Sequence, residues 1–147
     1  MKITILNENT VYRQGLLVEH GLSVVIEERD RKFLMDTGQS DVFLKNAKTL
    51  GVHLEDLDGI ILSHGHYDHC GGMEYLDGSR RLPPVYIQKS AFERKYSGTQ
   101  KDRHYIGMSG SHESWKADVR FTGDAREIAP GFWVIGNIPY LSLIHIS

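Results

Sequence analysis

Residues 59–75 read GIILSHGHYDHCGGMEY, and this stretch determines how the rest of the chain is interpreted. An apolar run of β character, 60–62, is followed by four potential metal ligands that lie within six residues of one another: His64, His66, Asp68 and His69. Imidazole and carboxylate suit zinc and, less exclusively, iron or manganese. A structural zinc site usually takes several cysteines, and Cys70 is the only one in the chain. The cluster therefore predicts a catalytic metal site rather than a histidine-rich polar loop.

The spacing divides the four ligands into two pairs. If the chain stays extended after Ser63, alternate residues share a face, so His64 and His66 can converge on one ion. Asp68 and His69 follow after a turn and point elsewhere, which fits a second ion, as in two-metal hydrolytic sites. Asp68 is also placed to orient the nucleophilic water, so we assign it the catalytic role.

Composition describes an ordinary soluble domain. The 147 residues are 40% hydrophobic and 24% charged, with no run of about 18 apolar residues and no signal peptide. A single cysteine favours a reducing cytoplasm, and a net charge of −2 argues against a nucleic-acid partner. We expect a cytoplasmic protein that acts on a small molecule and does not bind membranes.

Positive charge is concentrated in one segment. The segment from Ser79 to Tyr105 contains seven Lys and Arg residues but only two acidic residues, a net charge of +5, and aromatic residues lie among them. Such a stretch is usually a solvated face. Near an active site it could instead receive an anionic or phosphorylated ligand.

The pattern of apolar and turn residues predicts strands and helices in alternation. Strands are expected at 2–6, 22–28, 31–35, 59–63, 85–88, 119–122, 126–128 and 132–135. Helices are expected at 42–50, capped by Ser40 or Asp41 and ended by Gly51, and at 73–76 and 90–96, with a long loop over 97–115. This order predicts an α/β or α+β fold.

Several motifs resemble those of a known superfamily. Residues 64–69 match the HxHxDH signature of the metallo-β-lactamase fold, Gly71-Gly72 continues it, and 33–38 resembles that superfamily's first motif, a strand ending in an aspartate. Residues 8–10, 19–23 and 105–107 resemble a narrower group of stand-alone metal-dependent hydrolases, some described as dihydropterin-phosphate synthase-like. The resemblance covers about Lys2 to Tyr140.

The resemblance implies an αββα sandwich with two metals at one edge, of which residues 1–140 are the amino-terminal portion of a single domain. It also implies that the remaining ligands, later histidines and often a bridging acid, lie beyond this chain. Asp36 could simply cap a turn; the resemblance favours a supporting role, holding the metal-site loop by hydrogen bonds. Residues 141–147, LSLIHIS, resemble translated sequencing adapter, so we expect a non-native tail; the alternative is a genuine apolar strand.

The other reactive residues receive plainer interpretations. Cys70 is expected to be a small buried residue at a helix start, although a ligand or nucleophile role is conceivable at such a position. His20 is expected to make a structural hydrogen bond and His53 to be exposed. His104 and His112 are expected to face solvent or substrate rather than a metal.

The sequence therefore predicts a hydrolase with a dinuclear zinc-type centre, with iron or manganese possible, acting on an ester, amide or phosphoester. One alternative is an iron-dependent oxidoreductase of the same fold, resembling persulfide dioxygenases. The other is an incomplete metal-binding fragment without activity.

Overall fold

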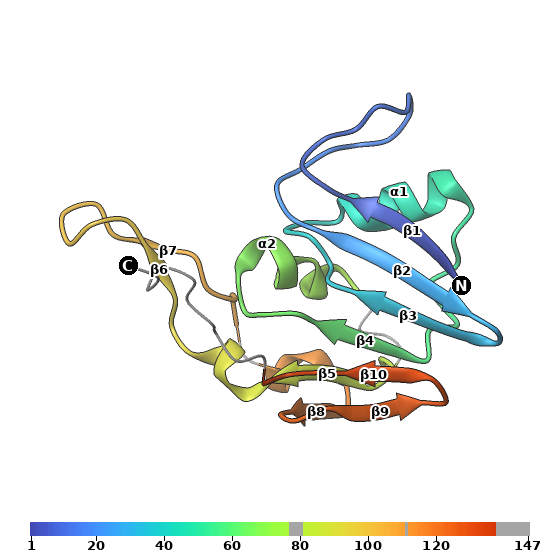
Figure 1. Cartoon of the computed structure of the whole chain (residues 1–147). Coiled ribbons are helices and arrows are strands. Elements are labelled where there is room, and N and C mark those ends of the chain that lie inside the picture. Colours follow the sequence, from blue (N-terminus) through green and yellow to red (C-terminus); the bar gives the residue numbers. More distant parts are fainter. Residues whose placement is uncertain (77–80, 111, 138–147) are drawn as a thin grey trace, which may run out of the picture.

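In the computed structural model, which describes residues 1–76, 81–110 and 112–137, a six-stranded mixed sheet forms the centre of the chain (Figure 1). The strands occur in the order β1-β2-β3-β4-β5-β8. Their bounds are β1 Lys2–Asn7, β2 Ser23–Glu28, β3 Arg31–Met35, β4 Gly59–Leu62, β5 Val85–Gln88 and β8 Val119–Thr122. The molecule has the mixed α/β class that the sequence predicts.

The sheet joins an antiparallel part to a parallel part. β1, β2 and β3 form an antiparallel meander, and β3, β4, β5 and β8 run parallel. Helix α1, Val42–Leu50, connects β3 to β4, beginning after Asp41 and ending at Gly51, whose φ of 67° is the left-handed conformation typical of a helix end. Because β3 and β4 are parallel, the residues that follow them meet at one edge of the sheet.

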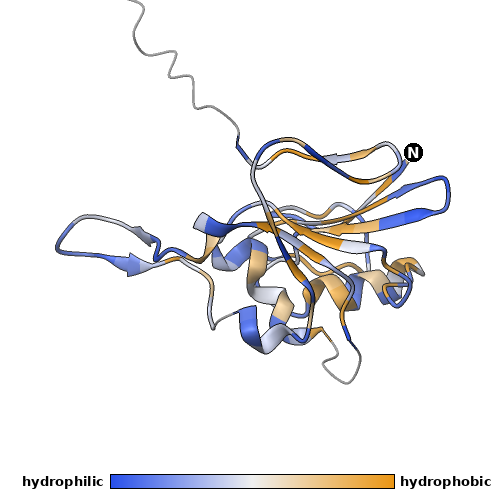
Figure 2. Cartoon of the chain, turned by 90° about the horizontal axis from the view of Figure 1, so that it is seen from below, coloured by the Kyte–Doolittle hydropathy of each residue, from blue (hydrophilic) through white to orange (hydrophobic). Residues whose placement is uncertain are grey.

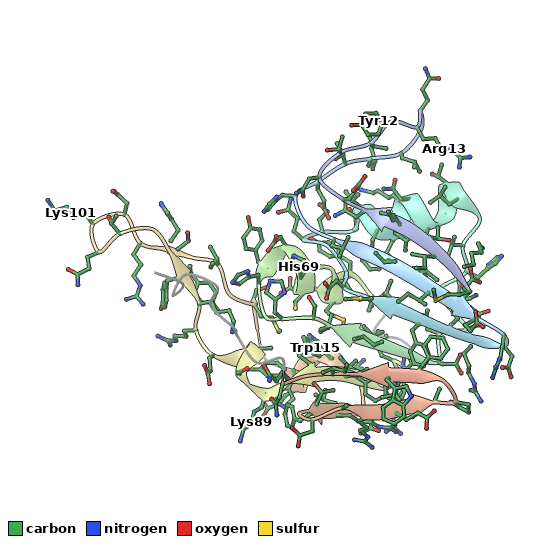
Figure 3. The ribbon with its side chains drawn as sticks, in the orientation of Figure 1. Tyr12, Arg13, His69, Lys89, Lys101 and Trp115 are labelled. Atoms are coloured by element: carbon green, nitrogen blue, oxygen red, sulfur yellow. The ribbon has the colours of Figure 1, made fainter. Side chains whose placement is uncertain are left out.

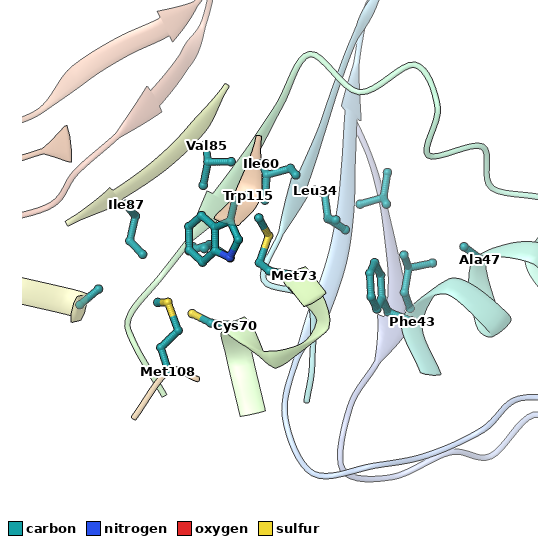
Figure 4. Close-up of a cluster of buried hydrophobic side chains, with 14 residues drawn as sticks. Leu34, Phe43, Ala47, Ile60, Cys70, Met73, Val85, Ile87, Met108 and Trp115 are labelled. Carbon is teal, nitrogen blue, oxygen red and sulfur yellow. The ribbon is translucent and has the colours of Figure 1, made fainter. Parts of the chain in front are cut away.

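The hydrophobic core lies between the sheet and the helices that cover one of its faces (Figure 2). Leu34, Ile60 and Val85 project from three neighbouring strands and are fully buried. Phe43 and Ala47 of α1 pack against one end of this layer, and Trp115 and Met73 lie toward the other (Figure 4). Burial of this alternating face fixes the register of the parallel strands.

The opposite face of the sheet is covered in part by a hairpin, β9 Arg126–Ala129 and β10 Phe132–Val134. Phe132 contacts Phe33 of the sheet with ring centroids 4.7 Å apart. A cavity of about 710 Å³ separates the hairpin from β2, β3 and β4. Ile3 and Ile5 of β1 remain 57% and 50% exposed on this face.

The remaining elements are short. They are α2 Tyr67–Cys70, the 3₁₀ turns Gly71–Tyr75, Lys89–Phe92 and His112–Trp115, and the strands β6 Tyr96–Ser97 and β7 His104–Tyr105. β6 and β7 form a hairpin that projects away from the sheet (Figure 1). No helix in the described part of the chain is long and apolar enough to cross a membrane.

Two expectations were wrong in this region. The helix predicted over 90–96 is a single 3₁₀ turn, Lys89–Phe92. The turn ends at Glu93, whose ψ of 145° is extended, and Lys95 Nζ donates to the carbonyls of Ser90 and Ala91 at 2.8 and 3.1 Å, as a lysine at a helix end commonly does. The loop predicted over 97–115 contains β7 and a 3₁₀ turn. The expected non-native tail, 141–147, lies outside the described residues.

Candidate metal centre

The four predicted ligands lie at the edge where β3 and β4 end. Asp36 follows β3 and Ser63 follows β4, and the backbone N–H of Asp36 donates to Ile61 O at 2.9 Å. The chain then passes through His64, Gly65 and His66 before α2 begins. The parallel pairing of two strands therefore places the aspartate beside the histidine-rich segment.

Asp36 is the centre of a buried hydrogen-bond network. Its side chain is fully buried, and its φ of 55° is a left-handed conformation that aspartate tolerates better than most residues. One carboxylate oxygen accepts from Ser63 N and the other from Ser63 Oγ, both at 2.7 Å. The second oxygen also contacts His69 Nδ1 at 2.7 Å. Asp36 thus joins both ends of the segment 63–69.

This contact determines which nitrogen of His69 is available to a metal. A carboxylate only accepts hydrogen bonds, so Nδ1 of His69 carries the proton and Nε2 is turned toward Asp68, 3.6 Å from its Oδ2. The same hydrogen bond raises the pKa of His69, against an opposing effect of burial. A carboxylate behind a histidine in this way is the usual support of a metal-binding imidazole.

His64 and His66 form a second close pair. Nε2 of His64 lies 3.0 Å from Nδ1 of His66, while Nδ1 of His64 lies 2.9 Å from Ser63 Oγ. Burial, and then the neighbouring His69 and His66, lower the pKa of His64. His64 is therefore held in its neutral form, which is the form that binds metals.

The two pairs adjoin one another, because the rings of His64 and His69 have centroids only 4.2 Å apart. Two atoms bound to one tetrahedral zinc at about 2.0–2.1 Å lie about 3.3 Å from each other. The separations within the pairs, 3.0 and 3.6 Å, bracket that value. In the described part of the chain, no group of three or more His, Cys, Asp or Glu side chains converges on a single point. The donor types and separations thus fit two ligands for each of two ions.

Glycines allow the surrounding backbone to approach the site closely. A Cβ on Gly65 would stand 1.8 Å from Ala91 O, and one on Gly72 would stand 2.1 Å from Thr37 O. Gly21 lies against the backbone of Asp68 in the same manner, since a Cβ on Gly21 would stand 1.9 Å from the Asp68 carbonyl oxygen. Any larger residue at these positions would push the segment 63–69, here called the ligand loop, away from its supports.

Cys70 is a structural residue. It is 2% exposed, and its Sγ donates to His64 O at 2.8 Å. Burial raises the pKa of the thiol far above its usual value, so it stays protonated and is a poor nucleophile or ligand. The expectation of a buried cysteine at a helix start is confirmed, because Cys70 ends α2 and caps the start of the 3₁₀ helix Gly71–Tyr75.

Two neighbours of the site were not predicted from the sequence. His20, expected to make only a structural hydrogen bond, places its Nε2 3.3 Å from Asp68 Oδ2. Ile106 accepts a hydrogen bond from Tyr67 N at 3.1 Å, and Gly107 pairs with His66, so the base of the β6–β7 hairpin adjoins the ligand loop. Both lie in motifs that resemble the narrower group of hydrolases, 19–23 and 105–107. That resemblance is the feature of the sequence that could have indicated them.

The other histidines lie away from the pairs. His53 is exposed, as expected, with a side chain that is 81% accessible beside Glu55. His104 is exposed in β7. His112 packs on Phe92 with ring centroids 4.7 Å apart, which agrees with a role other than metal binding.

Comparison with known proteins agrees with this geometry. Residues 16–139 match the metallo-beta-lactamase superfamily. The chain belongs to this superfamily. Members are metal-dependent, with zinc the typical metal, and are generally hydrolases.

Individual relatives match over almost all of this chain. The protein MJ0448 of Methanocaldococcus jannaschii is 34% identical over 141 residues, which are 93% of this chain and 53% of that protein. From the same organism, 7,8-dihydropterin-6-methyl-4-(beta-D-ribofuranosyl)-aminobenzene-5'-phosphate synthase is 24% identical over 92% of this chain and 49% of that protein. Among solved structures, Tm1679, a metal-dependent hydrolase of the beta-lactamase superfamily, aligns with a TM-score of 0.72 and 32% identity. The alignment covers 90% of this chain and 46% of Tm1679. The chain spans about half the length of the curated relatives it matches.

Proposed function

We propose that the protein containing this chain is a hydrolase with a two-metal centre, in which His64 and His66 bind one ion and Asp68 and His69 bind the other. One observation carries this proposal: the donor atoms within each ligand pair are 3.0 and 3.6 Å apart, close to the separation of two ligand atoms on one zinc ion. The buried carboxylate of Asp36 supports the second pair through His69. Zinc is the ion that the donor set and the superfamily favour, and iron or manganese would also be accepted by these ligands.

Bound zinc ions would supply a water of lowered pKa and would polarise the ester, amide or phosphoester that is cleaved. The protein's part is to hold the donors. Asp36 keeps the proton of His69 on Nδ1, so that Nε2 remains free. Asp68 lines a recess beside His69 with a side chain that is 12% exposed, and its carboxylate can orient the attacking water there.

We propose further that the substrate is a small molecule bearing an anionic or phosphorylated group. The base of the β6–β7 hairpin adjoins the ligand loop through Tyr67 and Ile106. Arg103 lies in this hairpin, stacked on Tyr96 at 3.8 Å, and Lys101 lies near its tip (Figure 3). The compound in the name of the dihydropterin relative carries a 5'-phosphate, which agrees with such a ligand.

Hydrolysis assays of the complete gene product test this function. A panel of p-nitrophenyl esters, phosphomonoesters and phosphodiesters should be cleaved in a metal-dependent manner, with anionic members preferred. His66→Ala should lower kcat/KM at least about 100-fold because it removes a ligand. His53→Ala should leave it unchanged, since His53 is exposed and distant from the ligand pairs.

Two results would contradict the proposal. One is a His66→Ala variant as active as the parent. The other is stoichiometric iron together with oxygen consumption on persulfide substrates and no hydrolysis, which would identify an oxidoreductase of the same fold instead.

A further inference from the structure

The loop between β1 and β2 reaches the metal-site edge and forms one wall of a recess there. The recess has a volume of about 250 Å³ and is lined by residues of this loop together with two proposed ligands: Glu8, Asn9, His20, Gly21, Leu22, Asp68 and His69. His20 is the loop residue that contacts a ligand side chain, with Nε2 3.3 Å from Asp68 Oδ2. Although the side chain of His20 is 65% exposed, the loop on both sides of it is fixed.

Glu19 fixes the loop on the amino-terminal side. Its backbone N–H donates to Asn7 Oδ1 at 3.3 Å. Its carboxylate accepts from the backbone N–H groups of Gln39 and Ser40, both at 3.1 Å, and from the Ser40 hydroxyl. Four hydrogen bonds therefore tie the residue before His20 to β1 and to the segment that follows Asp36.

Gly21 fixes the loop on the other side. Its N–H donates to Asn9 Oδ1 at 2.8 Å, and its φ of 120° is a conformation that side chains rarely adopt. Its Cα lies so close to Asp68 that a Cβ would stand 1.9 Å from the Asp68 carbonyl oxygen. The backbone of His20 is thus held against Asp68, so ordering its side chain costs rotamer entropy but no further backbone entropy.

The contact is suited to supporting a ligand. With a proton on Nε2, His20 would engage one lone pair of Asp68 Oδ2, the oxygen that also faces His69 Nε2 at 3.6 Å. The second lone pair of Oδ2 and both lone pairs of Oδ1 would remain for a cation, and the carboxylate would be held in one orientation. His69 receives the same kind of support from Asp36, with the roles of carboxylate and imidazole exchanged. Each member of the second ligand pair then has one supporting partner.

We infer that His20 is a positioning residue that orients the carboxylate of Asp68 toward the second metal ion. This inference rests on the proposed two-metal function. The inference explains the motif 19–23. Glu19 and Gly21 fix the backbone of the loop, and His20 fixes the orientation of the Asp68 carboxylate.

Metal affinity of the complete gene product tests the inference with His20→Ala and His20→Gln. Cobalt(II) or zinc is titrated into metal-free protein, and the affinity for each equivalent is measured together with the cobalt absorption spectrum. His20→Ala should weaken binding of one equivalent about 10–100-fold and leave the other unchanged. His20→Gln should restore most of the loss, because its Nε2–H can donate to the same oxygen.

Controls separate a positioning role of His20 from direct metal binding and from a general effect on the loop. Asn9→Ala, which frees Gly21 N without touching His20, should give a smaller loss at the same equivalent, and His53→Ala should give none. Unchanged affinity in His20→Ala would overturn the inference, as would a loss that His20→Gln does not restore, since the imidazole itself would then be a ligand. Parent protein that binds no metal would instead contradict the proposed function on which the inference rests.

Discussion

Asp36 shows how much of the site depends on a single buried residue. Its carboxylate is the acceptor for Ser63 N, Ser63 Oγ and His69 Nδ1, and it lies in a fully buried position. The carboxylate of Asp36 is the buried group, since Ser63 is exposed and His69 is half-buried, and its three hydrogen bonds offset the cost of its burial. Asp36 is therefore important for folding as well as for the orientation of His69.

We expect Asp36→Ala to lower the free energy of unfolding by about 3 kcal/mol, because it removes three hydrogen bonds to the carboxylate and places alanine at a left-handed φ. Asp36→Asn should lose less, since it keeps one carbonyl acceptor and tolerates that φ. Urea denaturation of metal-free protein measures both changes.

Asp56→Ala is the matched control. The pKa of Asp56 is lowered by its hydrogen bond with Lys32, but its side chain is 64% exposed. Loss of an exposed ion pair should cost less than about 1 kcal/mol. If Asp36→Ala were no more destabilising than this control, the central place of Asp36 in the site would be wrong.

The sequence indicated the four proposed ligands and, through the resemblance, a supporting role for Asp36, but it did not indicate the contact of His20 with Asp68. His64, His66, Asp68 and His69 could be proposed because ligand type and spacing are local properties of the sequence. The contact of His20 with Asp68 joins positions 48 residues apart in the sequence, so it depends on where the loop after β1 folds back. No local pattern encodes that distance.

At the scale of elements, the ligand loop is held by close backbone approach. Gly65 separates the two histidines of the first pair and faces the carbonyl of Ala91 in the 3₁₀ turn after β5. The approach leaves no space for a side chain, so a substitution there must displace one backbone segment or the other.

Gly65→Ala should therefore reduce stability by about 1–3 kcal/mol and weaken metal binding at the His64–His66 pair. Gly123→Ala provides the comparison, because the nearest atom to its Cβ would be Asn137 Nδ2 at 3.7 Å. Thermal unfolding of the metal-free variants should show a clear loss for Gly65→Ala and almost none for Gly123→Ala. Equal behaviour of the two would refute the argument from close approach.

Elements with strong local signals were the ones predicted correctly. Helix α1 has a polar start, an amphipathic face and Gly51 at its end, and it spans the predicted residues. The β6–β7 hairpin has only two residues in each strand, too few for an alternating pattern to be recognised. The helix predicted at 90–96 stops after one turn because the backbone becomes extended at Glu93, and the side chain of Lys95 then satisfies the carbonyls of Ser90 and Ala91 that a longer helix would have bonded.

At the scale of the whole molecule, the two faces of the sheet differ. One face is buried beneath the helices, and the other carries partly exposed apolar side chains beside the β9–β10 hairpin and its cavity. Ile3 and Ile5 pair across the sheet with Ile26 and Val24, so the exposed apolar surface continues from β1 into β2. Such a surface is prone to association in the chain as it stands.

The double substitution Ile3→Thr and Ile5→Thr should reduce binding of the dye ANS and slow aggregation of the 147-residue chain. Threonine retains strand propensity, so the thermal unfolding temperature should change little. Lys45→Thr on the exposed surface of α1 is a suitable control, with no effect on dye binding expected. Undiminished dye binding in the double variant would mean that this face is not the exposed apolar surface.

The central claim is that the segment 63–69 binds metal through two ligand pairs, and metal content tests it most directly. Elemental analysis of the complete gene product, purified with zinc present and freed of loosely bound ions, should find about two equivalents in the parent and in His53→Ala. His66→Ala should lose about one equivalent. An undiminished metal content in His66→Ala, or a parent protein that retains no metal, would contradict the account.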